Sequence, residues 1–116
     1  MADRLSGRHY RASEVADLRG EALGNAANAN RIMCRYRRAK SLLIQAARAL
    51  AEGSGDPLAE ARLLTHFGHY FLTLLCFDRA ASAFRMAEQR YRAIGQYQSA
   101  ARSLVARAEA VGDRHR

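Results

Sequence analysis

Two histidines three positions apart are the first residues in this sequence whose types and spacing could do chemistry. On a helix, His66 and His69 would face the same side and could share a metal ion. A metal site needs further ligands, however, and neither Cys34 nor Cys76 follows the histidines with ligand spacing. The sequence also lacks a glycine-rich phosphate loop, catalytically spaced carboxylates and a serine or cysteine elbow. We therefore expect no catalysis, no metal and no cofactor.

A run of cations is the densest charge feature. Five lie within ten residues: Arg31, Arg35, Arg37, Arg38 and Lys40. The whole chain has 19 Lys and Arg against 11 Asp and Glu, a formal net charge of +8. This cluster could bind an acidic protein, neutralise the phosphates of a nucleic acid, or simply face solvent. No nucleic-acid motif accompanies it, so we rank the acidic protein above the nucleic acid.

The elements that would position these residues are helices, most clearly in residues 61–94. Small and apolar residues recur there at helical spacing in two groups: Leu64, Phe67, Gly68 and Phe71, then Phe77, Ala80, Phe84 and Ala87. The pattern breaks near Cys76, which predicts two antiparallel helices joined by a turn. Gly68 and Ala80 would let the helix backbones approach closely, while large residues such as Phe84 fill the space beside them.

The upstream residues repeat this pattern. Tyr36, Ala39, Leu43 and Ala46 reproduce the spacing of Phe77, Ala80, Phe84 and Ala87. Asn30 then corresponds to Phe71, a position where the pattern favours a large apolar residue. Ala39 and Ala80 are 41 positions apart, and residues 53–57 supply a loop that accounts for part of this length. Downstream, one more helix follows without a partner, so we predict five helices.

This order of small and aromatic residues resembles the tetratricopeptide repeat, whose standard period is about 34 residues. The resemblance implies an all-α fold, a short α-solenoid of antiparallel helix pairs with about two repeats and a closing helix. We expect a flexible basic arm over residues 1–12, the repeat domain over 13–112 and a tail over 113–116. The cysteines are expected to be buried and reduced.

Several local signals refine the helix ends. Ser13 suits a capping hydroxyl, Gly53 a left-handed helix end, and Asp56-Pro57 a cap followed by a first helical residue. Gly95 and Gly112 are expected to end the last two helices. The buried stripe expected in the closing helix comprises Tyr97, Ala100, Ala101, Leu104, Val105, Ala108 and Val111.

The resemblance also implies a concave groove lined by the first helix of each repeat. The residues it assigns to partner binding are Asn28, Arg31, Arg62, Thr65, His69, Thr73 and Arg102, with Val105 and Glu109 beside them. Such a surface suits an extended peptide that carries carboxylates, because Arg can bind an acid bidentately. Some family members clamp a C-terminal carboxylate with Lys and Asn. Asn28 matches one such position, but Gly24 and His66 occupy two others, so chaperone-tail binding is not expected. An ordinary solvated groove is the alternative.

The leading hypothesis is a non-catalytic adaptor or chaperone-like subunit that binds a segment of an acidic protein. The basic patch, Arg35, Arg37, Arg38 and Lys40, supports nucleic-acid binding as an alternative. A detached regulatory module is another, because Gly95-Gln96-Tyr97 and the long period resemble repeats in the sensor portions of bacterial regulators. Apolar repeat ends leave self-association open. Without an apolar run long enough for a membrane span or a signal peptide, we expect a cytoplasmic protein.

Overall fold

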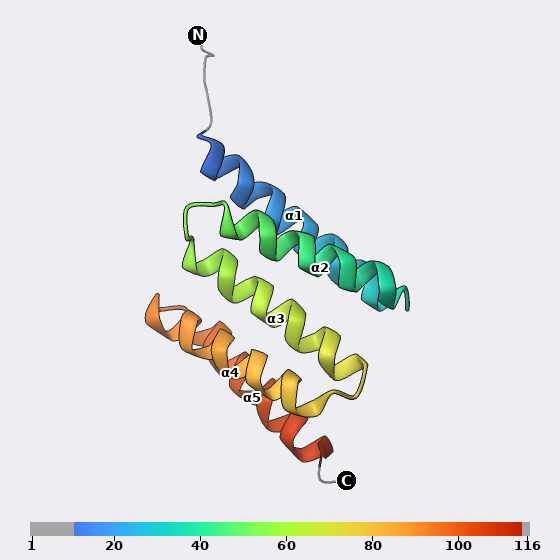
Figure 1. Cartoon of the computed structure of the whole chain (residues 1–116). Coiled ribbons are helices and arrows are strands. Elements are labelled where there is room, and N and C mark those ends of the chain that lie inside the picture. Colours follow the sequence, from blue (N-terminus) through green and yellow to red (C-terminus); the bar gives the residue numbers. More distant parts are fainter. Residues whose placement is uncertain (1–10, 115–116) are drawn as a thin grey trace.

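The described part of the chain consists of five helices joined by short turns. The computed structural model describes residues 11–114, and no strand occurs within them. The helices are α1 (Ala12–Ile32), α2 (Tyr36–Ala51), α3 (Pro57–Thr73), α4 (Phe77–Ala93) and α5 (Tyr97–Arg114). Figure 1 shows them stacked from α1 at the top to α4 and α5 at the bottom. Sequential neighbours pack on each other and α1 also contacts α3. This confirms the predicted all-α solenoid of antiparallel helix pairs.

One turn geometry recurs at three helix ends. The residue after the helix takes a left-handed conformation, with φ of 63° at Cys34, 62° at Leu75 and 76° at Gly95. The next amide then donates back across the last turn: Arg35 to the Asn30 carbonyl, Cys76 to Phe71 and Gln96 to Tyr91, at 2.8 to 2.9 Å. The first two turns are 41 positions apart, as the sequence repeat predicts.

Small residues set the helix separations. Ala39 and Ala46 in α2, like Ala80 and Ala87 in α4, are fully buried. Phe84 and Leu43, which occupy equivalent positions, are the largest fully buried side chains among the described residues. Gly68 lies directly against the Phe84 ring, so close that a Cβ at this position would be 2.5 Å from Cε1. The predicted close approach of α3 and α4 is therefore confirmed.

The start of α3 follows its sequence signal, whereas two other predicted ends were wrong. Asp56 Oδ1 accepts a hydrogen bond of 3.0 Å from the Leu58 amide, and Pro57 is the first residue of α3. Ser13 does not cap α1, because the helix starts at Ala12 and the Arg11 amide is bonded by Glu14. Gly53 does not take the predicted left-handed conformation, because the left-handed glycine of the α2–α3 loop is Gly55.

Gly53, predicted to be left-handed, instead makes room for α1. The Asp17 carboxylate lies against its Cα and accepts hydrogen bonds from the Ser54 amide and hydroxyl. The close approach of this side chain therefore explains the glycine. The predicted basic arm lies, up to residue 10, outside the described residues, as do residues 115 and 116 of the predicted tail.

The buried face of α5 differs from the prediction. Ala100, Ser103 and Ala110 are buried against the rest of the fold. The larger members of the predicted stripe are exposed, with 65% of Tyr97, 46% of Leu104 and 59% of Val105 accessible, and Ala101 and Ala108 are exposed too. The predicted stripe was wider than the real contact, because α5 packs chiefly on α4 and this one neighbour covers only its small residues. The helix also continues through Gly112 to Arg114.

Two further observations concern residues within the described range. Cys34, expected to be buried, is exposed at the left-handed turn, and Cys76 is half-buried; both are free thiols. Among residues 11–114, no helix is both long and apolar enough to cross a membrane.

Candidate functional site

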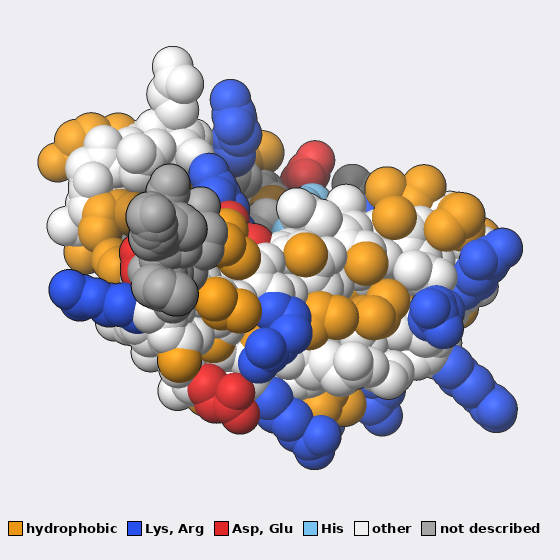
Figure 2. Space-filling model, turned by 90° about the horizontal axis from the view of Figure 1, so that it is seen from above, with side chains coloured by type: hydrophobic (Ala, Val, Ile, Leu, Met, Phe, Trp, Pro, Cys, Tyr) orange, Lys and Arg blue, Asp and Glu red, His pale blue; other side chains and the backbone are white. Residues whose placement is uncertain are grey.

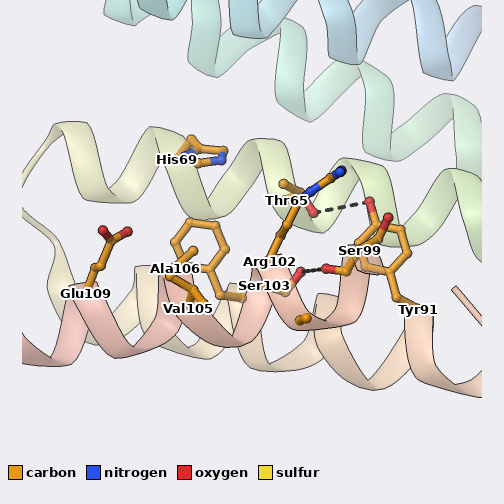
Figure 3. A pocket seen from close by; sticks show the side chains of 11 residues that line it. Thr65, His69, Tyr91, Ser99, Arg102, Ser103, Val105, Ala106 and Glu109 are labelled. Atoms are coloured by element: carbon orange, nitrogen blue, oxygen red, sulfur yellow. Dashed lines mark hydrogen bonds between the residues drawn. The ribbon is translucent and has the colours of Figure 1, made fainter. Parts of the chain in front are cut away.

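A pocket lies between α3 and α5, and three of the predicted groove residues line it. Both helices pack on α4, and the space left between them has a volume of about 580 Å³. It is lined by Thr65 and His69 of α3, Phe84 and Tyr91 of α4, and Ser99, Ala101, Arg102, Ser103, Val105, Ala106 and Glu109 of α5. Figure 3 shows these side chains converging between the two ribbons. We refer to this space as the α3–α5 pocket.

The small residues of α5 explain why the pocket exists. Because the buried residues of α5, Ala100, Ser103 and Ala110, are all small, this helix packs closely on α4 and chiefly on that helix. Gly68 likewise brings α3 down onto Phe84. Helices α3 and α5 therefore both pack on α4, and the rings of Phe84 and Tyr91 form the floor of the pocket between them.

The floor of the α3–α5 pocket is apolar and fixed. Phe84 is fully buried, and the His69 ring meets it edge to face with 5.1 Å between the centroids. At the other end, the Tyr91 oxygen lies 3.5 Å from Thr65 Oγ1. The Thr65 hydroxyl donates to the Ala61 carbonyl, so Tyr91 is the donor in this contact. The Tyr91 hydroxyl is therefore engaged with Thr65, and Tyr91 contributes its ring to the pocket lining.

Opposite charges border the two ends of the pocket. Arg102 extends from α5 toward α3 beside Thr65, whereas Glu109 lies at the far end beside His69 (Figure 3). Within residues 11–114, Arg102 has neither a hydrogen-bond nor an ion-pair partner. An exposed guanidinium at the mouth of an apolar pocket can bind a carboxylate without first breaking an internal ion pair.

The surroundings of His69 favour its neutral form. Burial lowers the pKa of His69, the positive charge of Arg31 lowers it further, and the Glu109 carboxylate partly opposes both effects. A neutral imidazole offers one donor and one acceptor, so His69 can bond to a peptide group without adding charge.

The histidine pair suggested by the sequence does not face one site. His66 Cδ2 lies 3.2 Å from where a Cβ on Gly24 would be, so its ring packs toward α1, whereas His69 lies over Phe84 of α4. Burial lowers the pKa of His66 as well, followed by the positive charges of its neighbours His69, Arg31 and Arg62.

Three predicted groove residues form a cross-link between α1 and α3 instead of lining the pocket. Arg31 Nη1 donates to Thr73 Oγ1 at 3.1 Å, and its Nε and Nη2 donate to Asn28 Oδ1 at 3.3 and 3.1 Å. The Thr73 hydroxyl in turn donates to the His69 carbonyl at 2.9 Å. These polar groups are therefore engaged within the fold.

Arg62, the predicted counterpart of Arg102, is also engaged. Its Nη1 lies 2.9 Å from Glu21 Oε1 and forms an ion pair between α3 and α1. Of the seven predicted partner-binding residues, the structure thus brings Thr65, His69 and Arg102 together in the pocket. It places the other four along the α1–α3 seam.

Sequence reasoning missed the floor of the pocket and anticipated two of its α5 residues besides Arg102. Val105 and Glu109 had been mapped to the groove and do line it. Tyr91, Ser99 and Ser103 had not been identified. The available signal was the position of Tyr91, which lies seven residues after Phe84 on the same helical face and corresponds to Leu50 in the preceding repeat.

The basic patch lies elsewhere. Arg35, Arg37, Arg38 and Lys40 are all exposed, at the turn before α2 and in its first turns. None of the four has an ion-pair partner among the described residues. Arg31, which the sequence placed in the same cluster, is turned inward to Asn28 and Thr73.

Comparison of the chain with protein-family models, curated proteins and solved structures found no match. Its function therefore has to be argued from the pocket and the charged surface.

Proposed function

We propose that this chain is a non-catalytic protein-binding module of the tetratricopeptide type, an adaptor or chaperone-like subunit that holds a segment of a partner in the α3–α5 pocket. One observation carries the proposal. Accessible apolar side chains at Val105 and Ala106, above a floor formed by Phe84, adjoin an exposed guanidinium at Arg102 that lacks a partner among the described residues. Apolar anchoring combined with one charged contact is how small pockets recognise peptide side chains.

The charges of the pocket define the chemistry of the segment. A carboxylate of the partner binds Arg102, and a neighbouring aromatic or branched aliphatic side chain enters the pocket and packs on Val105 and Ala106, its accessible apolar residues. At the far end, Glu109 accepts from a backbone amide or a basic side chain of the partner, and neutral His69 bonds to a peptide group. The preferred segment is therefore acidic at one end only, with a defined direction along α5.

The size of the pocket fits a short segment. About 580 Å³ lies within the usual range of ligand pockets, roughly 300 to 1,000 Å³. That space holds one or two large side chains and excludes a folded element. The partner is therefore expected to contribute a loop or a terminus that orders on binding, at an entropic cost that keeps the affinity moderate.

Selection from a random peptide library displayed on phage, followed by calorimetry with the selected peptides, tests the proposal. We expect enrichment of peptides with Asp or Glu close to a large apolar residue. Replacing Arg102→Gln should weaken their binding about 10- to 100-fold, because a hydrogen bond to a charged group contributes about 1.5 to 3 kcal/mol. Val105→Glu, at the exposed pocket edge, should weaken it as well by placing a like charge near the peptide carboxylate.

Arg62→Gln is the matched control. It removes the same charge from the equivalent position of the preceding repeat, where the guanidinium is already paired with Glu21 outside the pocket. We expect binding within about twofold of the original chain. Selected peptides that bind equally well to Arg102→Gln and Val105→Glu would exclude the pocket as the site.

A further inference from the structure

All the charged side chains on the exposed side of α2 are positive. The helix contains Arg37, Arg38, Lys40 and Arg48 and no Asp or Glu. Its apolar residues are turned the other way: Leu42, Leu43, Ala46, Ala49 and Leu50 are all buried. Figure 2 looks down on the α1–α2 end of the molecule and shows Lys and Arg side chains in blue along its lower edge and right-hand end, where acidic side chains are few.

Three of these cations and one isoleucine lie in line. Arg37, Lys40, Ile44 and Arg48 recur at intervals of three and four residues, so they occupy one strip of the helix surface and border one shallow hollow. We call this strip the α2 stripe. Arg37 and Arg48 are 11 residues apart, which places them about 16 Å from each other along the axis. The stripe points directly away from the buried residues of α2.

Helix stability does not explain the stripe. Positive side chains in the first turns of a helix oppose its dipole, and α2 has no acidic residue in its first turn and no side-chain cap at Arg35. Within residues 11–114 none of the cations of α2 has an ion-pair partner, whereas Arg19, Arg62 and Arg90 each pair with a glutamate. Helix α2 therefore carries four cations without ion-pair partners among the described residues, and those in its first turns slightly destabilise the helix.

We propose that the α2 stripe binds the phosphate backbone of a nucleic-acid duplex, independently of base sequence. A rigid row of exposed cations with regular spacing matches a regular row of phosphates. The stripe has no exposed aromatic side chain on which unpaired bases could stack, which disfavours a single strand. Contacts from a row of cations to phosphates supply affinity and register but carry no sequence information, so we expect binding of duplexes irrespective of sequence.

Two other anionic surfaces fit this face less well. A bilayer would require apolar side chains beside the cations, and α2 offers only Ile44, which is 39% exposed, since its other large apolar residues are in the core. An acidic protein would require a buried anchor, and the hollow beside the stripe is lined by Arg37, Lys40, Ser41, Ile44, Gln45 and Arg48 without an aromatic residue. The experiment below therefore compares binding of the duplex with binding of anionic vesicles and of an acidic polypeptide.

The experiment measures fluorescence anisotropy of a labelled DNA duplex of mixed sequence over a series of salt concentrations. With the three cations of the α2 stripe in contact, the logarithm of the binding constant should fall with the logarithm of salt concentration with a slope of about −3. The double variant Arg37→Gln, Arg48→Gln should reduce the magnitude of this slope by about 2 and weaken binding at least tenfold at low salt. Both positions are exposed, and an unchanged circular dichroism spectrum verifies folding.

The double variant Arg79→Gln, Arg85→Gln is the matched control, since it removes the same charge from two exposed positions on α4 that lie outside both the α2 stripe and the α3–α5 pocket. It should leave the slope unchanged. An equal loss in both variants would mean that net charge alone attracts the duplex, and the proposal would be wrong. Tighter binding of phosphatidylserine vesicles, polyglutamate or single-stranded DNA than of the duplex at the same salt concentration would also overturn it.

Discussion

Replacing Gly68→Ala tests the contact that seats α3 on α4 and forms the pocket floor. The new Cβ would lie 2.5, 2.7 and 2.8 Å from Cε1, Cδ1 and Cζ of Phe84. Carbon atoms in contact are normally about 3.5 to 4.0 Å apart, so the helices or the ring must move by about 1 Å. Phe84 is fully buried and can yield only toward the α3–α5 pocket.

Two opposing terms determine the magnitude. Overpacking of a dense core costs about 1 to 3 kcal/mol, and contacts this short favour the upper part of that range. Alanine gains about 1 kcal/mol over glycine in a helix interior. We therefore expect Gly68→Ala to lower the free energy of unfolding by about 1 to 2 kcal/mol, and the melting temperature by about 4 °C per kcal/mol. Urea titration followed by circular dichroism measures the effect, provided the transition is two-state.

Two other helical glycines serve as controls. A Cβ on Gly24 would come no closer than 3.2 Å to the edge of the His66 ring, so Gly24→Ala should change stability little. A Cβ on Gly112 would meet nothing within 4 Å, so Gly112→Ala should stabilise the chain by several tenths of a kcal/mol. The reasoning fails if Gly68→Ala is as stable as Gly24→Ala. It also fails if Phe84→Leu, which removes two of the three crowding atoms, Cε1 and Cζ, shows no favourable coupling with Gly68→Ala in a double-mutant cycle.

Three further predictions concern buried polar groups. Asn30→Leu should stabilise the fold by about 1 to 2 kcal/mol in urea, because Asn30 Oδ1 is buried without a partner among the described residues; a destabilised variant would refute this. Arg31→Ala should lower the free energy of unfolding by about 1 to 2 kcal/mol, because it removes the hydrogen bonds that link Asn28 of α1 to Thr73 of α3. The exposed control Arg35→Ala should lower it by at most about 0.5 kcal/mol, and equal effects of the two variants would contradict the link. The lowered pKa values of His66 and His69 mean that the fold favours their neutral forms, so stability should be fully present above about pH 6.5 and decline as pH falls below it; NMR titrations showing ordinary histidine pKa values would refute this.

The predictions from sequence were correct at positions where the residue type has a single structural explanation. Ala80, Phe84 and Ala87 could only be a close-packed face, and the pattern at Ala39, Leu43 and Ala46 located the preceding repeat 41 residues away. Asp56 followed by proline indicated the start of α3. Each of these signals is local, arising within one or two turns of helix, and none depends on where another element packs.

The failures all depended on neighbours that the sequence does not reveal. Gly53 suggested a left-handed end, but its real constraint is Asp17 of α1, a residue 36 positions earlier. Leu104 and Val105 fit a buried stripe only if a further helix covers α5. Arg31 and Arg35 are one turn apart in sequence, yet the helix end at Cys34 lies between them and directs one inward and the other to solvent.

The two proposed surfaces have no residue in common, which predicts independent occupancy. The α3–α5 pocket is built by α3, α4 and α5, whereas the stripe lies on the side of α2 that faces away from its neighbours. Electrostatic coupling between them is screened over about 8 Å at physiological ionic strength. The affinity of a selected peptide should therefore change by less than about twofold when the duplex is present at saturating concentration.

Competition between peptide and duplex would contradict this independence, because linked binding must be reciprocal. If Arg102→Gln relieved the competition and Arg37→Gln did not, the guanidinium in the pocket would be the shared anion site, and the two proposals would reduce to one. If Arg37→Gln relieved it instead, the acidic end of the peptide would bind the α2 stripe, and the pocket would hold only the apolar part of the segment.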